Sequence, residues 1–141
     1  MAITKEKIQN EILGFSVVSD IFHKCKQEMQ YLLIELVVET SRYSCNQEGY
    51  VKNMKETSIR FQKPYFIGRR SQNYCMLTLQ PQLDRILVDV RTDGKSIDSE
   101  ILKLSHLGNR YSGGFEWHRF TVKKENEIEE ESLLIDFQNF K

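Results

Sequence analysis

Apolar residues recur at helical spacing in the first third of the chain. Ile8 and Ile12 lie one turn apart and Gly14 follows as a stop signal, so we predict a short helix over residues 1–14. Over residues 16–40 a second apolar stripe advances in alternating steps of four and three residues, which predicts one long helix. The stripe consists of Val18, Phe22, Cys25, Met29, Leu32 and Leu36.

Two roles remain open for this stripe. The same stepping is found in coiled coils, where it would make the helix a dimerisation element. The stretch covers only about three heptads, however, which favours burial against a sheet of the same chain. Its end, residues 32–40, is rich in β-branched side chains and is also compatible with a strand.

Over residues 55–123 apolar and polar side chains alternate, as is typical of strands in a sheet. Ile59 and Phe61 share one face of the first strand, and Pro64 predicts that this strand is an edge strand or contains a bulge. A second strand places Cys75, Leu77 and Leu79 on one face and Tyr74, Met76 and Thr78 on the other. A third aligns Ile86, Val88 and Val90. We expect these apolar faces to share one core with the helical stripe.

Turns and a further strand complete the pattern. We predict turns at residues 81–84 and 92–95. We also predict a short helix over residues 96–107 and a fourth strand over residues 115–122. Asn126 and Glu129 form a capping-box pattern, which predicts a helix over 126–140. The expected fold is therefore a single α+β domain over residues 1–141. It contains a mostly antiparallel sheet of four to five strands, with N-terminal and C-terminal helices packed on it.

Composition narrows the possible functions. The 141 residues include 20 basic and 20 acidic side chains, which argues against a uniformly basic nucleic-acid coat. Three cysteines form no disulfide framework, and no signal peptide or run of 18 apolar residues is visible. We therefore expect a cytoplasmic protein with no membrane partner.

Part of the chain resembles a known family. The relevant features are Tyr65-Phe66-Ile67, Leu77-Thr78-Leu79, the loop from Gly108 to Gly113, Glu116 and Glu125-Asn126-Glu127-Ile128. With them, residues 55–135 resemble a small domain of unknown function labelled "predicted transport protein", often found at the C-terminal end of restriction-type nucleases. In this chain Asn109-Arg110 replaces the His-Trp pair of that family. The resemblance implies a non-catalytic module near DNA-directed machinery and supplies no catalytic residues.

The main charge signal is local. Residues 51–91 contain eight cations and three acids, a balance of +5, with aromatic residues between the cations. Arginines beside aromatic rings suit phosphate contact together with base stacking. The predicted nucleic-acid-binding residues are Arg60, Lys63, Tyr65, Arg69, Arg70 and Arg110. The alternative is a solvated sheet face whose charges are paired by the acidic C-terminal helix.

Other constellations have weaker support. The glycine loop at residues 107–114 lacks the Lys-Ser/Thr of a phosphate-binding P-loop. A nuclease interpretation of Asp84, Asp89 and Lys95 is disfavoured because Lys95 follows a turn signal that directs it away from Asp84. The histidines lack metal-binding spacing, so we expect no metal or cofactor, and Cys25 and Cys75 fit core thiols.

No coherent set of catalytic residues emerges. The sequence favours a non-catalytic binding or accessory module that contacts DNA or RNA in a restriction or defence context. The alternative is a protein-interaction or oligomerisation module without a nucleic-acid role. The expected partners of the chain are DNA or RNA, a second copy of the chain in a weak homodimer, or a larger nuclease assembly.

Overall fold

The computed structural model describes residues 5–44, 49–53, 55–67, 70–91, 104–108, 117–124 and 126–128. It begins with three helices, α1 (Lys5–Leu13), α2 (Ser16–Lys24) and α3 (Gln27–Ser41). The strands are β1 (Ser58–Ile67), β2 (Arg70–Gln80), β3 (Arg85–Arg91), β4 (Ser105–Gly108) and β5 (Trp117–Val122). The turn between β2 and β3, expected at residues 81–84, contains the 3-10 helix η1 (Pro81–Leu83).

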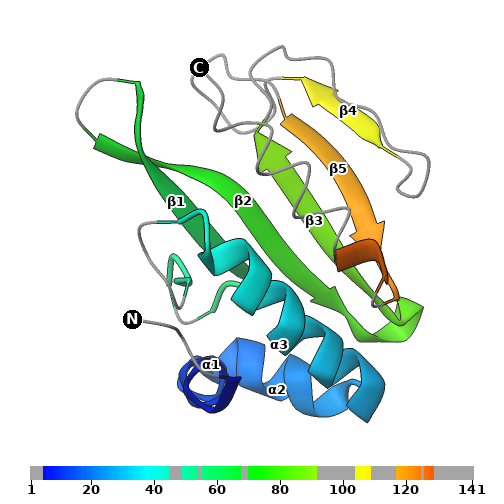
Figure 1. Cartoon of the computed structure of the whole chain (residues 1–141). Helices are drawn as coiled ribbons and strands as arrows, with labels where there is room; N and C mark the ends of the chain where they lie inside the picture. Colours follow the sequence, from blue (N-terminus) through cyan, green and yellow to red (C-terminus); the bar gives the residue numbers. More distant parts are fainter. Residues whose placement is uncertain are drawn as a thin grey trace.

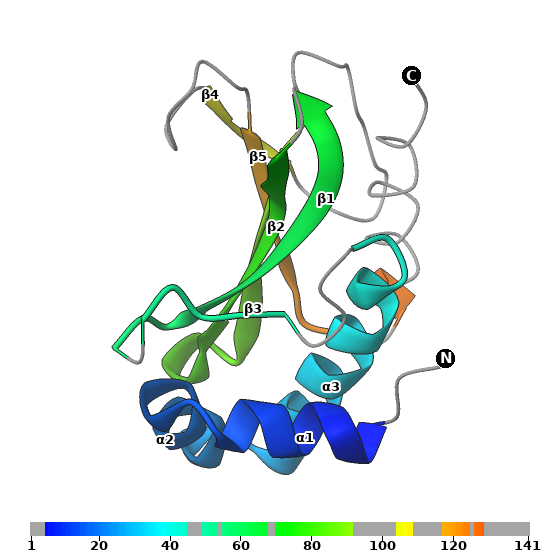
Figure 2. The same ribbon diagram turned by 90° about the vertical axis from the view of Figure 1, so that its left-hand side faces the viewer.

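The five strands form one antiparallel sheet in the order β1-β2-β3-β5-β4. The three helices lie on one side of this sheet, with α1 packed on α2 and α3 (Figures 1 and 2). The predicted α+β class and antiparallel sheet are thus confirmed. The opposite side of the sheet carries no helix among the described residues, and we call it the open face.

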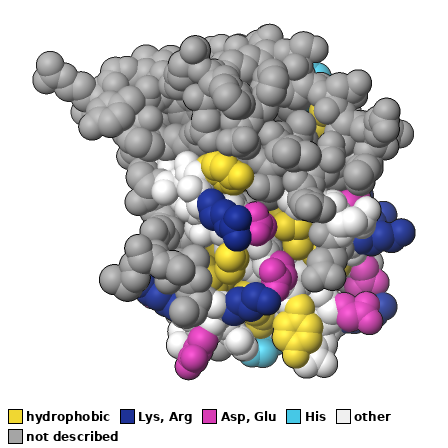
Figure 3. Space-filling view, viewed as in Figure 1, with side chains coloured by type: hydrophobic (Ala, Val, Ile, Leu, Met, Phe, Trp, Pro, Cys, Tyr) yellow, Lys and Arg dark blue, Asp and Glu magenta, His cyan; other side chains and the backbone are white. Residues whose placement is uncertain are grey.

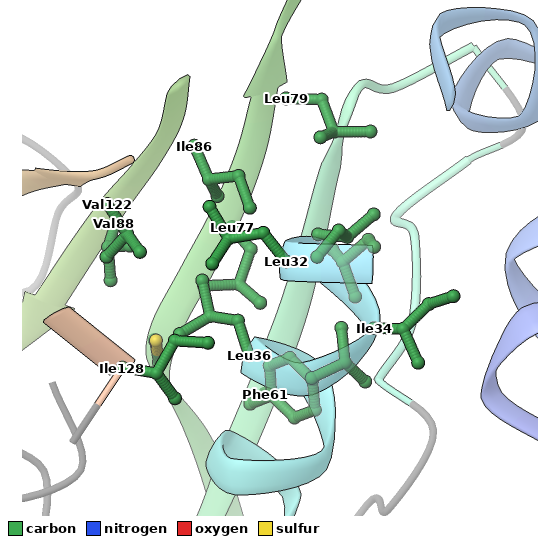
Figure 4. Close-up of a cluster of buried hydrophobic side chains, with 14 of the residues drawn as sticks. Leu32, Ile34, Leu36, Phe61, Leu77, Leu79, Ile86, Val88, Val122 and Ile128 are labelled. Carbon is green, nitrogen blue, oxygen red and sulfur yellow. The ribbon is translucent and has the colours of Figure 1, made fainter. Parts of the chain in front are cut away.

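The core lies between α3 and the sheet, as the apolar pattern predicts. Leu32 and Leu36 of α3 approach Phe61, Leu77 and other apolar side chains of the strands (Figure 4). The helical stripe and the predicted strand faces belong to the same buried cluster. The stripe is therefore buried against the sheet of the same chain. Helix α3 continues through Ser41 and does not change to a strand.

The predicted single helix over residues 16–40 is wrong in one respect, because it is two helices. Cys25 and Lys26 have extended backbone angles, with ψ of 151° and 153°, and separate α2 from α3. The side-chain amide of Gln30 donates to the carbonyl oxygens of Phe22 and Cys25, at 2.9 and 3.3 Å. A side chain of the second helix thus satisfies carbonyls at the end of the first. No glycine or proline marks this break in the sequence.

Tyr74 is also placed differently from the prediction. It is fully buried in the core, whereas strict alternation puts it on the face opposite Cys75. The pairing explains the difference, because Phe61 pairs with Cys75 while the next residue, Gln62, pairs with Asn73. Tyr74 is therefore the extra residue of a β-bulge, which turns its ring toward the helices. Its hydroxyl donates to the Thr40 carbonyl oxygen at 2.8 Å.

Two further segments differ from or extend beyond the expectations. Residues 105–108 form β4, so the predicted helix over 96–107 is wrong at its end, and residues 96–103 lie outside the described residues. Residues 126–128 are helical, but the rest of the predicted helix over 126–140 also lies outside them. The Glu127 carboxylate accepts hydrogen bonds from the backbone N–H groups of Lys123 and Lys124, at 2.8 and 2.9 Å. The capping contact is thus made by Glu127, whereas the predicted cap residue Asn126 lies within the helical turn and Glu129 lies outside the described residues.

Candidate nucleic-acid interface

Strands β1 and β2 extend beyond the rest of the sheet as a two-stranded ribbon. Among the described residues, β3 pairs with β2 over Cys75–Gln80, and residues 70–74 of β2 have no β3 partner there. They pair instead with residues 62–67 of β1, where Ile67 lies opposite Arg70. We call residues 62–74 the ribbon. The described parts of its two strands, residues 62–67 and 70–74, project past the other strands in Figure 1.

The charged residues of the ribbon are all basic. Between Glu56 and Asp84 the sequence has no acidic residue, and the ribbon itself contains Lys63, Arg69 and Arg70. Pro64 lies in edge strand β1, in an irregular stretch between Lys63 and Ile67, as the proline predicts. Three of the eight cations counted over residues 51–91 thus belong to the sequence of the ribbon.

The six predicted site residues fall into three groups. Arg60 lies in the part of β1 that belongs to the five-stranded sheet. Lys63, Tyr65 and Arg70 lie on the ribbon strands, and only their backbone is described. Arg69 and Arg110 lie outside the described residues. The strand pairing therefore brings the backbones of Lys63 and Arg70 onto one element.

Arg60 is less accessible than the prediction requires. Its side chain is only 14% exposed, and its Nη2 atom is 3.8 Å from the Glu56 carboxylate. The backbone of Arg60 also exchanges two hydrogen bonds with Tyr50, at 2.7 and 3.0 Å. Arg60 thus belongs to the attachment of the ribbon to the sheet more than to an exposed surface.

The base of the ribbon is fixed by a polar cluster. The Tyr50 hydroxyl donates to Asn73 Oδ1 at 2.6 Å and accepts from Gln62 Nε2 at 3.4 Å. Gly49 precedes this cluster with a φ of 74°, and a Cβ atom there would lie 2.5 Å from Ile59 Cγ2. Only glycine permits both this angle and this close approach. The segment around Tyr50 is therefore held tightly against β1.

A row of paired residues crosses the open face from β1 to β4. The register aligns Arg60, Met76, Asp89, Arg119 and Ser105. Asp89, whose side chain is 5% exposed, accepts two hydrogen bonds from the Arg119 guanidinium at 2.7 and 3.2 Å. This bidentate pair neutralises one of the arginines on the face. Within the described chain, the open face is thus a partly buried network rather than a fully solvated basic surface.

The nuclease interpretation has no geometric support in the described residues. Asp84 forms the left-handed turn before β3, with a φ of 48°, and its carboxylate contacts Lys26 at 3.1 Å. Asp89 is bound to Arg119, and Lys95 lies outside the described residues. Each of the two carboxylates therefore forms an ion pair with a basic side chain, and among the described residues the two do not form a shared metal site.

The cysteines that the structure describes have the predicted structural role. Cys25 and Cys75 are buried free thiols, and Cys45 lies outside the described residues. Burial raises the pKa of the Cys25 thiol, and the negative charge of Asp84 raises it further. A thiol that resists ionisation is a poor nucleophile, so Cys25 is suited to packing.

Strand pairing also places two histidines side by side, although they are far apart in the sequence. His106 of β4 lies directly opposite His118 of β5, with the ring centroids 4.8 Å apart. They are twelve residues apart, a distance that gives no helical metal signature, so only knowledge of the pairing reveals them. The described residues contain no group of three or more His, Cys, Asp or Glu side chains placed to bind a metal ion.

Comparison with known proteins gives no assignment. No protein-family model, curated protein or solved structure matches the chain. Among the described residues, the helices are too short or too polar to cross a membrane.

Proposed function

We propose that the chain is a non-catalytic nucleic-acid-binding module whose β1–β2 ribbon contacts the phosphate backbone. The supporting observation is the projection of a two-stranded ribbon that carries three basic residues and no acidic one. Such a ribbon is narrow enough to enter the major groove of duplex DNA, which is about 12 Å wide. Its positive charge gives attraction to phosphates irrespective of base sequence.

The aromatic residues of the ribbon support the same partner. Tyr65 and Phe66 lie in the ribbon sequence between Lys63 and the Arg69-Arg70 pair. Aromatic rings stack on unpaired bases while neighbouring cations contact phosphates, so single-stranded nucleic acid is a second form of this ligand. The resemblance of residues 55–135 to a domain found beside restriction-type nucleases points to the same setting, in which the module accompanies a larger nuclease assembly.

The described part of the helix side carries charges of both signs. Basic and acidic side chains are interspersed over the helices, with apolar side chains between them (Figure 3). Lys5 pairs with Glu35 there, and Lys26 pairs with Asp84. Because these charges largely cancel, we place the nucleic-acid contact on the ribbon.

The proposal is tested by fluorescence anisotropy with labelled single- and double-stranded oligonucleotides at low salt. Replacing Arg69 and Arg70 with Ala is expected to weaken binding by about tenfold or more, since two phosphate contacts are lost. A matched control replaces Lys123 and Lys124, two adjacent exposed cations outside the ribbon. This control is expected to bind like the native chain. Absence of binding at micromolar protein would contradict the proposal.

A cleft on the helix side favours the alternative, a protein-interaction module. It has a volume of about 970 Å³, lies between α1, α3 and residues 123–124, and includes Tyr31, which is 60% exposed. The apolar helical stripe is itself buried, so we place a homodimer contact on this cleft or on a sheet edge rather than on the stripe. Light scattering over a hundredfold concentration range tests self-association, and a constant mass of one chain would exclude it.

A further inference from the structure

Strands β4 and β5 hold two imidazole rings side by side at one edge of the sheet. His106 and His118 are directly opposed in the antiparallel pairing. Their ring centroids are 4.8 Å apart and their planes are inclined by 46°. His106 is exposed and His118 is half-buried, so the pair is accessible at least from the side of β4.

The separation of the rings suits two ligands of one metal ion. With Zn–N bonds of about 2.0–2.1 Å and a near-tetrahedral angle, the centroids of two bound imidazoles lie about 5 Å apart. The observed 4.8 Å is close to this value before any adjustment of the side chains. Neutral imidazole is a common ligand for zinc, copper and nickel. The two strands thus hold the imidazoles at a separation that one shared ion requires.

We propose that His106 and His118 bind a divalent transition-metal ion of the zinc, nickel and copper class. Among the described residues, the two imidazoles are the ligands that the site provides. The proposal is independent of nucleic-acid binding by the ribbon.

A metal ion at this position would join an edge strand to the sheet. Strand β4 has only four residues, and its pairing with β5 is irregular between His106 and Gly108. An ion bound by both strands adds a link across this short ladder. Because the ion binds the paired state and not the separated strands, it is expected to stabilise the fold in proportion to the logarithm of its concentration.

The test uses the full chain without a histidine tag and titrates Zn²⁺ or Ni²⁺ by calorimetry. We expect one ion per chain, and at least about a tenfold loss of affinity in His106→Gln and in His118→Gln, since each leaves a single imidazole. His23→Gln is a matched control, because His23 is the one other histidine of the sequence and lies exposed on α2. It is expected to bind the metal like the native chain.

A second readout covers the case in which a variant fails to fold. In the native chain, NMR resonances of two of the three imidazoles should shift on addition of Zn²⁺, while those of His23 stay in place. Zn²⁺ should also raise the melting temperature of the native chain and of His23→Gln. Absence of binding at millimolar Zn²⁺, retained affinity in both strand variants, or loss of affinity in His23→Gln would each overturn the proposal.

Discussion

Replacing Leu77 with Ala tests the packing of α3 on the sheet. Leu77 lies in the centre of β2, is 1% exposed, and belongs to the cluster that contains Leu36 and Phe61 (Figure 4). The substitution removes three carbon atoms from this cluster without adding a polar group. Its effect therefore reports whether this face of β2 packs against α3.

The expected magnitude has two parts. Burial contributes about 0.8 kcal/mol per methylene-sized group, so the lost transfer free energy is about 2.4 kcal/mol. The cavity that remains adds to this value, and fully buried leucines replaced by Ala typically lose about 2.7–5 kcal/mol of unfolding free energy. A loss of about 3 kcal/mol corresponds to a melting temperature lower by about 10 °C for a chain of this size.

Chemical denaturation followed by circular dichroism measures this loss. Leu83→Ala is a matched control, because Leu83 is 56% exposed in η1 and the same atoms are removed from a site near water. The control is expected to change the unfolding free energy by less than about 0.5 kcal/mol. Similar losses in Leu77→Ala and Leu83→Ala would refute the assigned strand phase.

Two further substitutions probe polar contacts of the sheet by the same denaturation assay. Arg119→Met removes both hydrogen bonds to the buried Asp89 carboxylate and should lower the unfolding free energy by about 1.5–3 kcal/mol. Adding Asp89→Leu should recover part of this loss, because no buried charge is then left unpaired. An Arg119→Met variant as stable as the native chain would show that the pair contributes nothing. Tyr74→Phe removes the buried hydrogen bond to the Thr40 carbonyl and should cost about 1 kcal/mol, whereas an unchanged stability would argue against the bulge geometry.

The apolar pattern was sufficient to predict the core, because the spacing of apolar residues indicates which face of each helix or strand is buried. Leu77, Leu79 and Val88 alternate with polar or less buried residues, and all three lie in the core. Pro64 likewise predicted the edge strand, because proline has no backbone N–H to donate to a neighbouring strand. These features depend on local chemistry that the sequence displays directly.

Features that depend on tertiary contacts were not predictable. The break at Cys25 and Lys26 contains no helix-breaking residue and is stabilised by Gln30 from the following helix. The bulge that buries Tyr74 arises from a shift in pairing with β1. The His106–His118 pair likewise requires the register of two strands. In each case, the determining partner lies on another element of the structure.

The candidate site was predictable only in part. The local excess of basic residues over 51–91 is visible in the sequence, but the projection of residues 62–74 follows from the unequal lengths of β2 and β3. The partial burial of Arg60 and the pairing of Arg119 with Asp89 depend on cross-strand neighbours. Charge counting alone therefore overestimated how many arginines are accessible.

The salt dependence of nucleic-acid binding tests the central proposal most directly. For the native chain, the logarithm of the association constant should fall linearly with the logarithm of salt concentration. Loss of the Arg69 and Arg70 contacts should reduce this slope by about 1.8 for duplex DNA, or about 1.4 for a single strand. The variant lacking Lys123 and Lys124 should keep the native slope. An unchanged slope in the ribbon variant, or an equal reduction in the control, would contradict binding through the ribbon.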